Sequence, residues 1–354
     1  MDDGRTATRE QIRLRAEEAG LGRVAEAVAD LARPGLRLVA KDVSRRAPDP
    51  AGEGFGEHPP LPEILQASRE ASASTRLGGV PLVGEGFSWP RRLARTRSRY
   101  GDEIRAGRPL TFVAQVNLAE VPTAEPSDGM LDLPRGGMLL FFCDEESLPY
   151  GSPEDSDAFG VAYLPLVPGD ETRMHLAEVP EGHAASEDHR DLLGRMLPDV
   201  VVLEALPELA LPAAYPEEVH AMGLSDAESD AYLRLTEELE REGARVPAEV
   251  AEAPGTARYP PIHRLGGVPH EIQNPMEAEC ELARRGEDPL ALPYSRREEI
   301  AEEAKARWRL LLQVDSDDAA GLMWGDAGML YYWIRDDDLA ARRFDRAWCV
   351  MQCY

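Results

Sequence analysis

Two pairs of polar side chains close apolar segments that are expected to be strands. Gln115 and Asn117 end one such segment, and Gln313 and Asp315 end another. Residues two apart in a strand point to the same face, so both side chains of a pair face the same way. Amides and carboxylates placed in this way suit recognition of a peptide backbone, an amide or a sugar hydroxyl. The competing interpretation, which the pattern favours, is that they cap the strands or bond neighbouring loops.

The two polar pairs belong to a sequence pattern that occurs twice. The hexapeptide Arg-Leu-Gly-Gly-Val-Pro stands at 76–81 and again at 264–269. Each copy is followed by an apolar strand that ends in Gln-Val-Asn or Gln-Val-Asp, and then by a glycine that opens a second apolar run. This order predicts an internal duplication that produces two related lobes. Under a pseudo-two-fold axis, the two polar pairs would converge on a groove between the lobes.

The paired Gly-Gly-Val-Pro loops have two interpretations. Glycine tolerates positive φ and lets a ligand approach backbone amides closely. The same property makes a structural turn that fixes how a strand enters its sheet, and this is the interpretation that we favour. Neither loop contains Gly-x-Gly-x-x-Gly or a Walker lysine, so the sequence does not support nucleotide binding. The structural loop residues are Gly78, Gly79, Pro81, Gly266, Gly267 and Pro269.

Two tryptophans extend the candidate site. Trp89 and Trp324 lie in expected loops near the two motifs. An aromatic ring beside amide side chains suits a binding groove, although most tryptophans in such positions simply pack. The ligand-binding candidates are Trp89, Gln115, Asn117, Gln313, Asp315 and Trp324.

The sequence contains no motif of an established catalytic class or metal site. Gly-x-Ser-x-Gly is absent, and Cys349 and Cys353 are too far apart for a Cys-x-x-Cys redox motif. The histidine spacings fit no zinc pattern, and the acidic run from Asp315 lacks the glycine and glutamate of a calcium loop. His263 and His270 flank the second Gly-Gly loop alone, so they are weak support for a function shared by both copies. We therefore predict no catalytic residue, no cofactor and no metal.

The charge of the chain restricts its partners. The sequence has 39 basic and 65 acidic residues, a net charge of −26. Such a field repels phosphate backbones and anionic lipids, so binding to nucleic acid or a membrane surface is disfavoured. Solubility is the ordinary explanation, and attraction of a basic partner is the alternative. No apolar run is long enough to span a membrane, and the few cysteines suggest reduced thiols in a cytoplasmic protein.

Hydrophobic periodicity predicts a mixture of helices and short strands. A capping box at Thr8 to Gln11 opens a helix over 9–32, and a second box at Ser295 to Glu298 opens a helix that runs to 307. Further helices are expected over 61–73, 216–222, 226–242 and 275–285. Strands are expected at 36–43, 109–118, 136–143, 159–167, 172–179, 199–211, 308–314, 328–334 and 346–354. Tight links between short strands favour antiparallel pairing.

The expected fold class is α+β, internally duplicated, with two related antiparallel β-rich lobes and flanking helices. Residues 1–60 would form an N-terminal helix, a short strand and a loop. Residues 61–245 would form the first lobe with a helical middle section, and 246–354 the second lobe. The proline-rich stretch 243–261 is the expected link between the lobes.

Several of these motifs together resemble the YwqG-like family, a bacterial family of unknown function. The resemblance rests on the Gly-Gly-Val-Pro loop, Phe87-Ser-Trp-Pro90, Pro109 to Asn117 and Leu133 to Phe142. It extends over roughly 70–354, where the second-lobe Gln-Val-Asp and Gly-Met-Leu-Tyr-Tyr-Trp segments also fit. It implies an α+β fold with internal duplication, and it brings no catalytic activity, cofactor or catalytic residue.

The leading hypothesis for function is non-catalytic recognition of a peptide, a protein or a small polar ligand in the groove between the lobes. One alternative is a hydrolase-type enzyme that uses acidic residues such as Asp315 as acid or base. Such an enzyme would be favoured by a carboxyl group with a strongly raised pKa in a deep site between the lobes. A third hypothesis is an acidic interaction protein or inhibitor of a basic protein partner.

Overall fold

The computed structural model describes most of the 354-residue chain, and all structural statements below refer to that part. The described residues are 8–42, 59–93, 96–97, 103–104, 106–122, 130–165, 173–180, 197–213, 217–244, 260–289 and 291–354.

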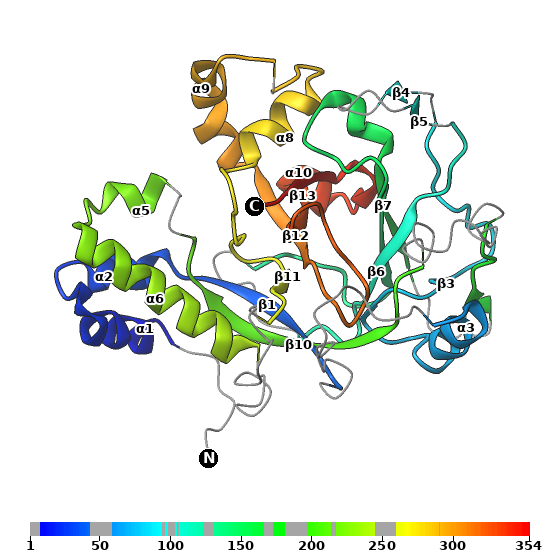
Figure 1. Ribbon diagram of the computed structural model, residues 1–354, viewed down its shortest axis with the longest axis horizontal. Helices are drawn as coiled ribbons and strands as arrows, with labels where there is room; N and C mark the ends of the chain where they lie inside the picture. The colour runs from blue at the N-terminus through cyan, green and yellow to red at the C-terminus, as the bar shows by residue number, and fades with distance from the viewer. Residues whose placement is uncertain are drawn as a thin grey trace.

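Among the described residues, ten strands form one continuous antiparallel sheet (Figure 1). Its order is β14-β13-β12-β11-β1-β10-β2-β6-β7-β8. The strands are β1 (Arg33–Ala40), β2 (Arg76–Leu77), β6 (Thr111–Asn117), β7 (Met138–Cys143), β8 (Phe159–Leu164), β10 (Val201–Ala210), β11 (His263–Leu265), β12 (Trp308–Asp315), β13 (Met329–Arg335) and β14 (Trp348–Gln352). The expected mixture of helices with an antiparallel sheet is therefore confirmed. Both motif copies lie in this one sheet.

The strands on the two sides of the central pair β1 and β10 have the same sequential order. β11 to β14 lie on one side, and β2, β6, β7 and β8 lie on the other. The register also agrees, because Arg264 pairs with Gln313 as Arg76 pairs with Gln115. In each half, the strand that carries the glutamine also pairs with the following strand, and this pairing contains a bulge. The residue that the pairing skips lies two positions before the glutamine. Strand order, register and bulge position are thus the same in both halves.

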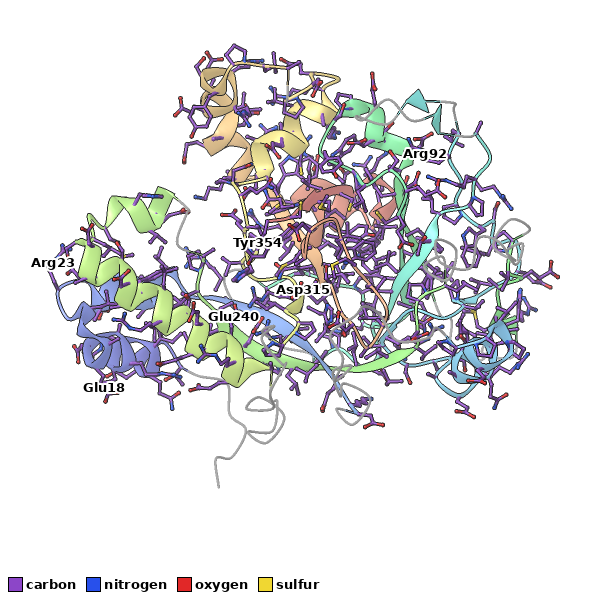
Figure 2. All side chains as sticks on the ribbon, viewed as in Figure 1. Glu18, Arg23, Arg92, Glu240, Asp315 and Tyr354 are labelled. Carbon is purple, nitrogen blue, oxygen red and sulfur yellow. The ribbon has the colours of Figure 1, made fainter. Side chains whose placement is uncertain are left out.

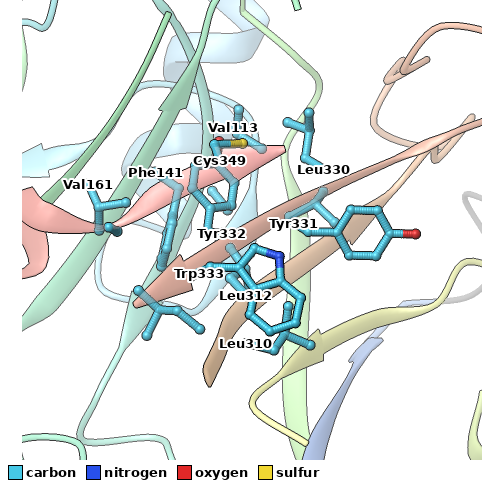
Figure 3. Packing of buried hydrophobic residues seen from close by; sticks show 14 of the residues in the cluster. Val113, Phe141, Val161, Leu310, Leu312, Leu330, Tyr331, Tyr332, Trp333 and Cys349 are labelled. Carbon is cyan, nitrogen blue, oxygen red and sulfur yellow. The ribbon is translucent and has the colours of Figure 1, made fainter. Parts of the chain in front are cut away.

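The sheet curves until its two ends pack against each other, which makes it barrel-like and nearly closed. The rings of Phe141 on β7 and Tyr332 on β13 lie 5.1 Å apart, and those of Phe159 on β8 and Trp348 on β14 lie 5.2 Å apart. The Tyr332 hydroxyl also donates a hydrogen bond to the carbonyl of Phe142 at 3.1 Å. Figure 3 shows Phe141 and Tyr332 within this cluster of buried side chains. The two halves therefore share one hydrophobic core.

Helices cover parts of the sheet and form a second, smaller core. The helical unit consists of α1 (Arg9–Ala16), α2 (Ala25–Leu31), α5 (Glu217–Ala221) and α6 (Asp226–Gly243), which lie together in Figure 1. Its own apolar cluster includes Ile12, Val28, Tyr232 and Leu235. Elsewhere, α3 (Leu61–Glu70) lies by the first motif copy, and α8 (Glu277–Arg284), α9 (Tyr294–Lys305) and α10 (Asp336–Ala340) lie by the second half.

Several predicted elements need correction. The helix expected over 9–32 is interrupted, since Gly20 has a φ of 95° and a π-helical turn spans Glu17–Leu21. The capping box at Thr8 is confirmed, but the one at Ser295 is wrong, because α9 begins at Tyr294 without a side-chain cap. The strand expected at 172–179 is only β9 (His175–Leu176), which pairs with β3 (Leu82–Val83). Most of the expected link at 243–261 lies outside the described residues.

Candidate functional site

Gln115 holds the first motif loop in place. Its side chain is fully buried. The amide nitrogen donates to the carbonyls of Ser72 and Ser74 at 2.7 and 2.8 Å, and the amide oxygen accepts from the backbone N–H of Leu82 at 3.2 Å. The same oxygen accepts from Arg76 at 3.2 Å. Every donor and acceptor of this amide is thus used inside the protein.

Gln313 makes two equivalent contacts in the second copy. It is also fully buried. Its amide nitrogen donates to the carbonyl of Ile262 at 2.7 Å, and its oxygen accepts from the N–H of His270 at 2.8 Å. Ile262 and His270 stand two residues before and six residues after the motif arginine, as Ser74 and Leu82 do in the first copy. Each glutamine therefore ties together the two ends of its own loop.

The glycines and arginines of the motif complete this structural unit. All four loop glycines, Gly78, Gly79, Gly266 and Gly267, have φ between 61° and 76°, a region that other residues rarely adopt. Arg76 and Arg264 donate to the carbonyls of Val80 and Val268 within their own loops. A Cβ at Gly78 would lie 2.2 Å from a backbone oxygen, which leaves no room for a side chain there. This geometry agrees with the structural turn favoured for the loops.

The remaining predicted site residues bond or pack inside the protein. Asn117 donates to the carbonyl of Ala73 at 2.7 Å, and Asp315 accepts from the N–H of Ile262 at 2.9 Å. The Trp89 indole donates to a carbonyl at 2.7 Å and packs against an aromatic ring, and Trp324 is fully buried in the main core. Ligand binding by these residues stays a prediction, while their contacts here are those of caps and core residues.

The structure does not bring the two polar pairs together. Along the hydrogen-bonded sheet, four strands, β11, β1, β10 and β2, stand between β12 with Gln313 and β6 with Gln115. Each glutamine bonds the loop of its own copy, as described above. Among the described residues, both glutamines are therefore buried inside the protein and do not line a shared groove.

A second set of residues differs between the copies, and it is more polar in the second copy. At register-matched positions, the first copy has small, amide or apolar residues where the second has titratable or amide side chains. The first-copy residues are Thr75, Leu82, Val83, Asn117, Ala119, Leu140 and Leu164, and their second-copy equivalents are His263, His270, Glu271, Asp315, Asp317, Tyr331 and Gln352, in that order. In the first copy, Leu82, Val83, Leu140 and Leu164 join an apolar cluster that includes Ile64 of α3.

His263 and Asp317 form a buried pair in the second copy. The Nε2 of His263 lies 3.1 Å from Asp317 Oδ2, and its Nδ1 accepts from the N–H of Asp315 at 3.1 Å. Because Nδ1 accepts, the proton of a neutral ring is on Nε2 and is donated to Asp317. The His263 side chain is fully buried. This pair fixes the β12 end and the loop that follows it.

Tyr331 and Gln352 hold the segment that follows the second loop. The Tyr331 hydroxyl donates to the His270 carbonyl at 2.6 Å. The Gln352 amide oxygen accepts from the N–H groups of Ile272 and Gln273, both at 3.1 Å, and its nitrogen donates to a carbonyl at 2.7 Å. Burial, followed by the negative charges of Asp315 and Glu271, raises the pKa of Tyr331 well above its usual value. Figure 2 labels Asp315 and Tyr354, two residues whose charges act on Tyr331.

Glu271 lies within this held segment, and its surroundings are acidic. Its side chain is 5% exposed, and among the described residues its Oε2 has no hydrogen-bond partner. Burial, then Glu277 and Glu218, raise the pKa of Glu271 to about 8, while Lys305 opposes the rise. Burial also raises the pKa of Glu277. We refer to Glu218, Glu271, Glu277 and Lys305 as the carboxyl cluster.

A separate network of four charges joins the helical unit to the sheet. Arg264 contacts Glu208 of β10 at 2.5 Å and Glu240 of α6 at 2.8 Å, and Arg37 of β1 also pairs with Glu240. Burial alone would raise the pKa of Glu240, but Arg264 and Arg37 lower it to about 2. A cavity lined by Glu208, Glu240 and Arg264 has a volume of about 10 Å³, room for one water molecule. This network therefore has the properties of a structural joint.

Sequence reasoning missed Glu271 because it searched for residues shared by both copies. The sequence signal that points to Glu271 is a difference between the copies: a titratable residue in one copy at a position that is apolar in the other. His270 carries the same signal, because its first-copy equivalent is Leu82. Its pKa is lowered, mainly by burial, so its imidazole is neutral at neutral pH.

Comparisons with known proteins give a family but no activity. No curated protein matches the chain. Within the described part of the chain, every helix is too short or too polar to cross a lipid bilayer. A family model described as "Domain of unknown function (DUF1963)" matches residues 75–353, which include both motif copies and the carboxyl cluster. The chain therefore belongs to the DUF1963 family of unknown function.

Proposed function

We propose that this protein is a non-catalytic binding protein and that its ligand site is the second motif copy, around His270 and Glu271. The observation that carries the proposal is the contrast between the two copies. Positions that close an apolar cluster under α3 in the first copy hold polar side chains in the second, and all but Gln352 are titratable. Burying such groups costs free energy unless they are paired, so their presence favours a functional requirement at this copy.

We also infer that the two halves arose by internal duplication. Support comes from the shared strand order, the matched pairing of each motif arginine with its glutamine, and the equivalent bulges. The two glutamines also bond equivalent backbone groups. On this view, the Arg-Leu-Gly-Gly-Val-Pro loops are inherited scaffold, and ligand recognition evolved on one copy. A cytoplasmic location and the domain boundaries at 60 and 245 stay predictions.

The test of the binding function exchanges second-copy residues for their first-copy equivalents. The double variant His270→Leu/Glu271→Val places the residues of positions 82 and 83 in the second loop. Wild type and variant are screened by thermal shift against metabolites, sugars, peptides and amines. A ligand at a hundred times its Kd adds ~2.7 kcal/mol of stability, which is readily detected. The proposal expects a ligand that stabilises the wild type and not the variant.

Two further variants keep this test decisive. Glu271→Gln preserves the shape of the side chain and is expected to fold, so it replaces the double variant if the latter is unfolded. Glu63→Gln changes an exposed glutamate on α3 and should bind as the wild type does. A ligand that stabilises all variants equally would place the binding site elsewhere and contradict the proposal.

A hydrolase-type enzyme is the second candidate function, and one observation favours it. With a pKa of about 8, Glu271 can hold or release a proton near neutral pH, as a general acid or base must. Turnover of ester, amide or glycoside probes that Glu271→Gln abolishes would support this candidate. Turnover that survives the substitution would exclude Glu271 from the reaction.

An acidic interaction protein is the third candidate. It rests on the net charge of −26, which favours encounter with a basic protein. Binding through surface charge should weaken strongly as salt is added, because screening acts within about 10 Å at 0.1 M ionic strength. A pull-down performed at low and high salt separates this candidate from a buried ligand site.

A further inference from the structure

We propose that the carboxyl cluster binds an organic cation, an ammonium or a guanidinium group, at the buried Oε2 of Glu271, which has no hydrogen-bond partner among the described residues. This inference rests on the proposed binding function and names its ligand class. The cluster gathers side chains from four separate segments. Glu218 comes from α5, Glu271 from the segment after the second loop, Glu277 from the start of α8 and Lys305 from the end of α9.

The first argument is an unsatisfied acceptor. Glu271 is 95% buried, since 5% of its side chain is exposed, and its Oε2 has no hydrogen-bond partner among the described residues. Most buried polar atoms in native proteins have a partner, and an exception calls for an explanation. An ammonium or guanidinium group provides hydrogen-bond donors and positive charge at once. A neutral ligand would provide only the donors.

The second argument is the charge balance. The cluster has three carboxyl groups and one ammonium, while Arg33 also acts on Glu218 and Glu302 also acts on Lys305, so the ionised groups still carry an excess of negative charge. Burial, Glu277 and Glu218 all favour the protonated form of Glu271, while Lys305 opposes them. Tyr331 from β13 also interacts with Glu271, but it is uncharged at neutral pH because its own pKa is raised. A second cation would restore the balance that the proton now provides.

The third argument is that the cluster already stabilises one cation, the ammonium group of Lys305. Lys305 pairs with Glu218, and its side chain is 42% exposed. Although burial lowers the pKa of Lys305, the hydrogen bond and charge of Glu218 and the charge of Glu277 raise it overall. The cluster therefore stabilises an ammonium group already. Lys305 and Glu218 are also its most exposed members, so they mark the side from which a ligand reaches Glu271.

The expected effect of pH follows from proton competition. If the ligand binds only when Glu271 is ionised, a pKa of about 8 leaves roughly a tenth of the protein competent at pH 7. Nearly all of it is competent at pH 9. The apparent Kd should therefore fall about tenfold between these two pH values, for a probe whose own charge is constant over the range. Guanidinium probes meet this condition, because their pKa exceeds 12.

The experiment is calorimetric titration of the full chain with arginine amide acetylated on its α-amine, with butylamine and with a hexa-arginine peptide. Each titration is run at pH 7 and 9, in two buffers of different protonation enthalpy, so that proton release is counted. The wild type should bind a guanidinium or ammonium probe about tenfold more tightly at pH 9 and release up to one proton. Glu271→Gln should abolish the proton release, and Glu63→Gln should behave as the wild type does.

The outcomes separate this inference from the function on which it rests. Binding of the small probes supports a free ligand, and binding of the peptide alone supports a side chain of a basic protein partner. Binding that is insensitive to Glu271→Gln, or restricted to divalent metal ions, overturns the cation site. A neutral ligand that is lost in His270→Leu/Glu271→Val overturns it too, but leaves the binding function intact. If no ligand distinguishes that variant from the wild type, both proposals fail.

Discussion

Replacement of Glu271 by glutamine is expected to stabilise the protein at alkaline pH. Burial and the neighbouring carboxylates raise the pKa of Glu271 from 4.5 to about 8. The folded protein therefore keeps a proton that the unfolded chain releases above pH 4.5. The free energy of unfolding must consequently fall as the pH rises from about 4.5 to about 8, and the loss is complete above the folded-state value. A rise of about 3.5 in pKa corresponds to at most ~5 kcal/mol of unfolding free energy. Because Glu271 and Glu277 interact, this free energy belongs to the titration of both groups together.

Urea unfolding at steps between about pH 5 and about pH 9 measures this effect directly. Glu271→Gln lacks the titrating group, so its stability should match the wild type near pH 5 and exceed it by ~2–5 kcal/mol near pH 9. The exposed control Glu63→Gln should follow the wild type throughout. Equal pH dependence in the wild type and in Glu271→Gln would refute the conclusion that Glu271 is buried and protonated at neutral pH.

The remaining predictions concern the motif loops. Gln115→Ala and Gln313→Ala should each lower the free energy of unfolding by about 2–4 kcal/mol, because buried backbone groups lose their partners; a change below about 0.5 kcal/mol would contradict the clamp role. Arg264→Met should cost about 3–5 kcal/mol, since it leaves the two carboxylates Glu208 and Glu240 with Arg37 as their one remaining guanidinium partner among the described residues. Arg76→Met should cost less, because no carboxylate among the described residues pairs with Arg76. Denaturant unfolding of the two arginine variants compares them, and equal losses would count against this account.

Much of the fold could be predicted because periodicity reports burial. The strands expected at 136–143 and 109–118 are β7 and β6, and the helix expected over 226–242 is α6. Short links predicted antiparallel pairing correctly. The role of Pro34 and Gly35 was harder to predict. They follow the helix expected over 9–32 and look like a turn, but they lie inside β1, where a Cβ at Gly35 would lie 3.0 Å from the Cα of Gly267 in the second loop.

Other features depend on tertiary contacts that no local pattern contains. The central place of β1 results from its pairing with β10 and β11, more than 150 residues away along the chain. The bulges beside Gln115 and Gln313 decide which side chains point to the loops, and a strict alternation cannot predict them. The predicted site residues were recognisable as special, but their contacts are internal. A repeated polar residue can be repeated because both copies need the same clamp.

This distinction gives a rule for separating scaffold from function in a duplicated chain. Both copies form the same strands and the same loop. The residues that they share, such as Gln115 and Gln313, are therefore explained by the stability of that structure. A difference between copies has no such explanation when it lowers stability. Glu271 is such a difference, because its equivalent Val83 packs in an apolar cluster, whereas the buried carboxyl must hold a proton at neutral pH. A residue that costs stability in one copy and is absent from the other is where a function specific to that copy should be sought.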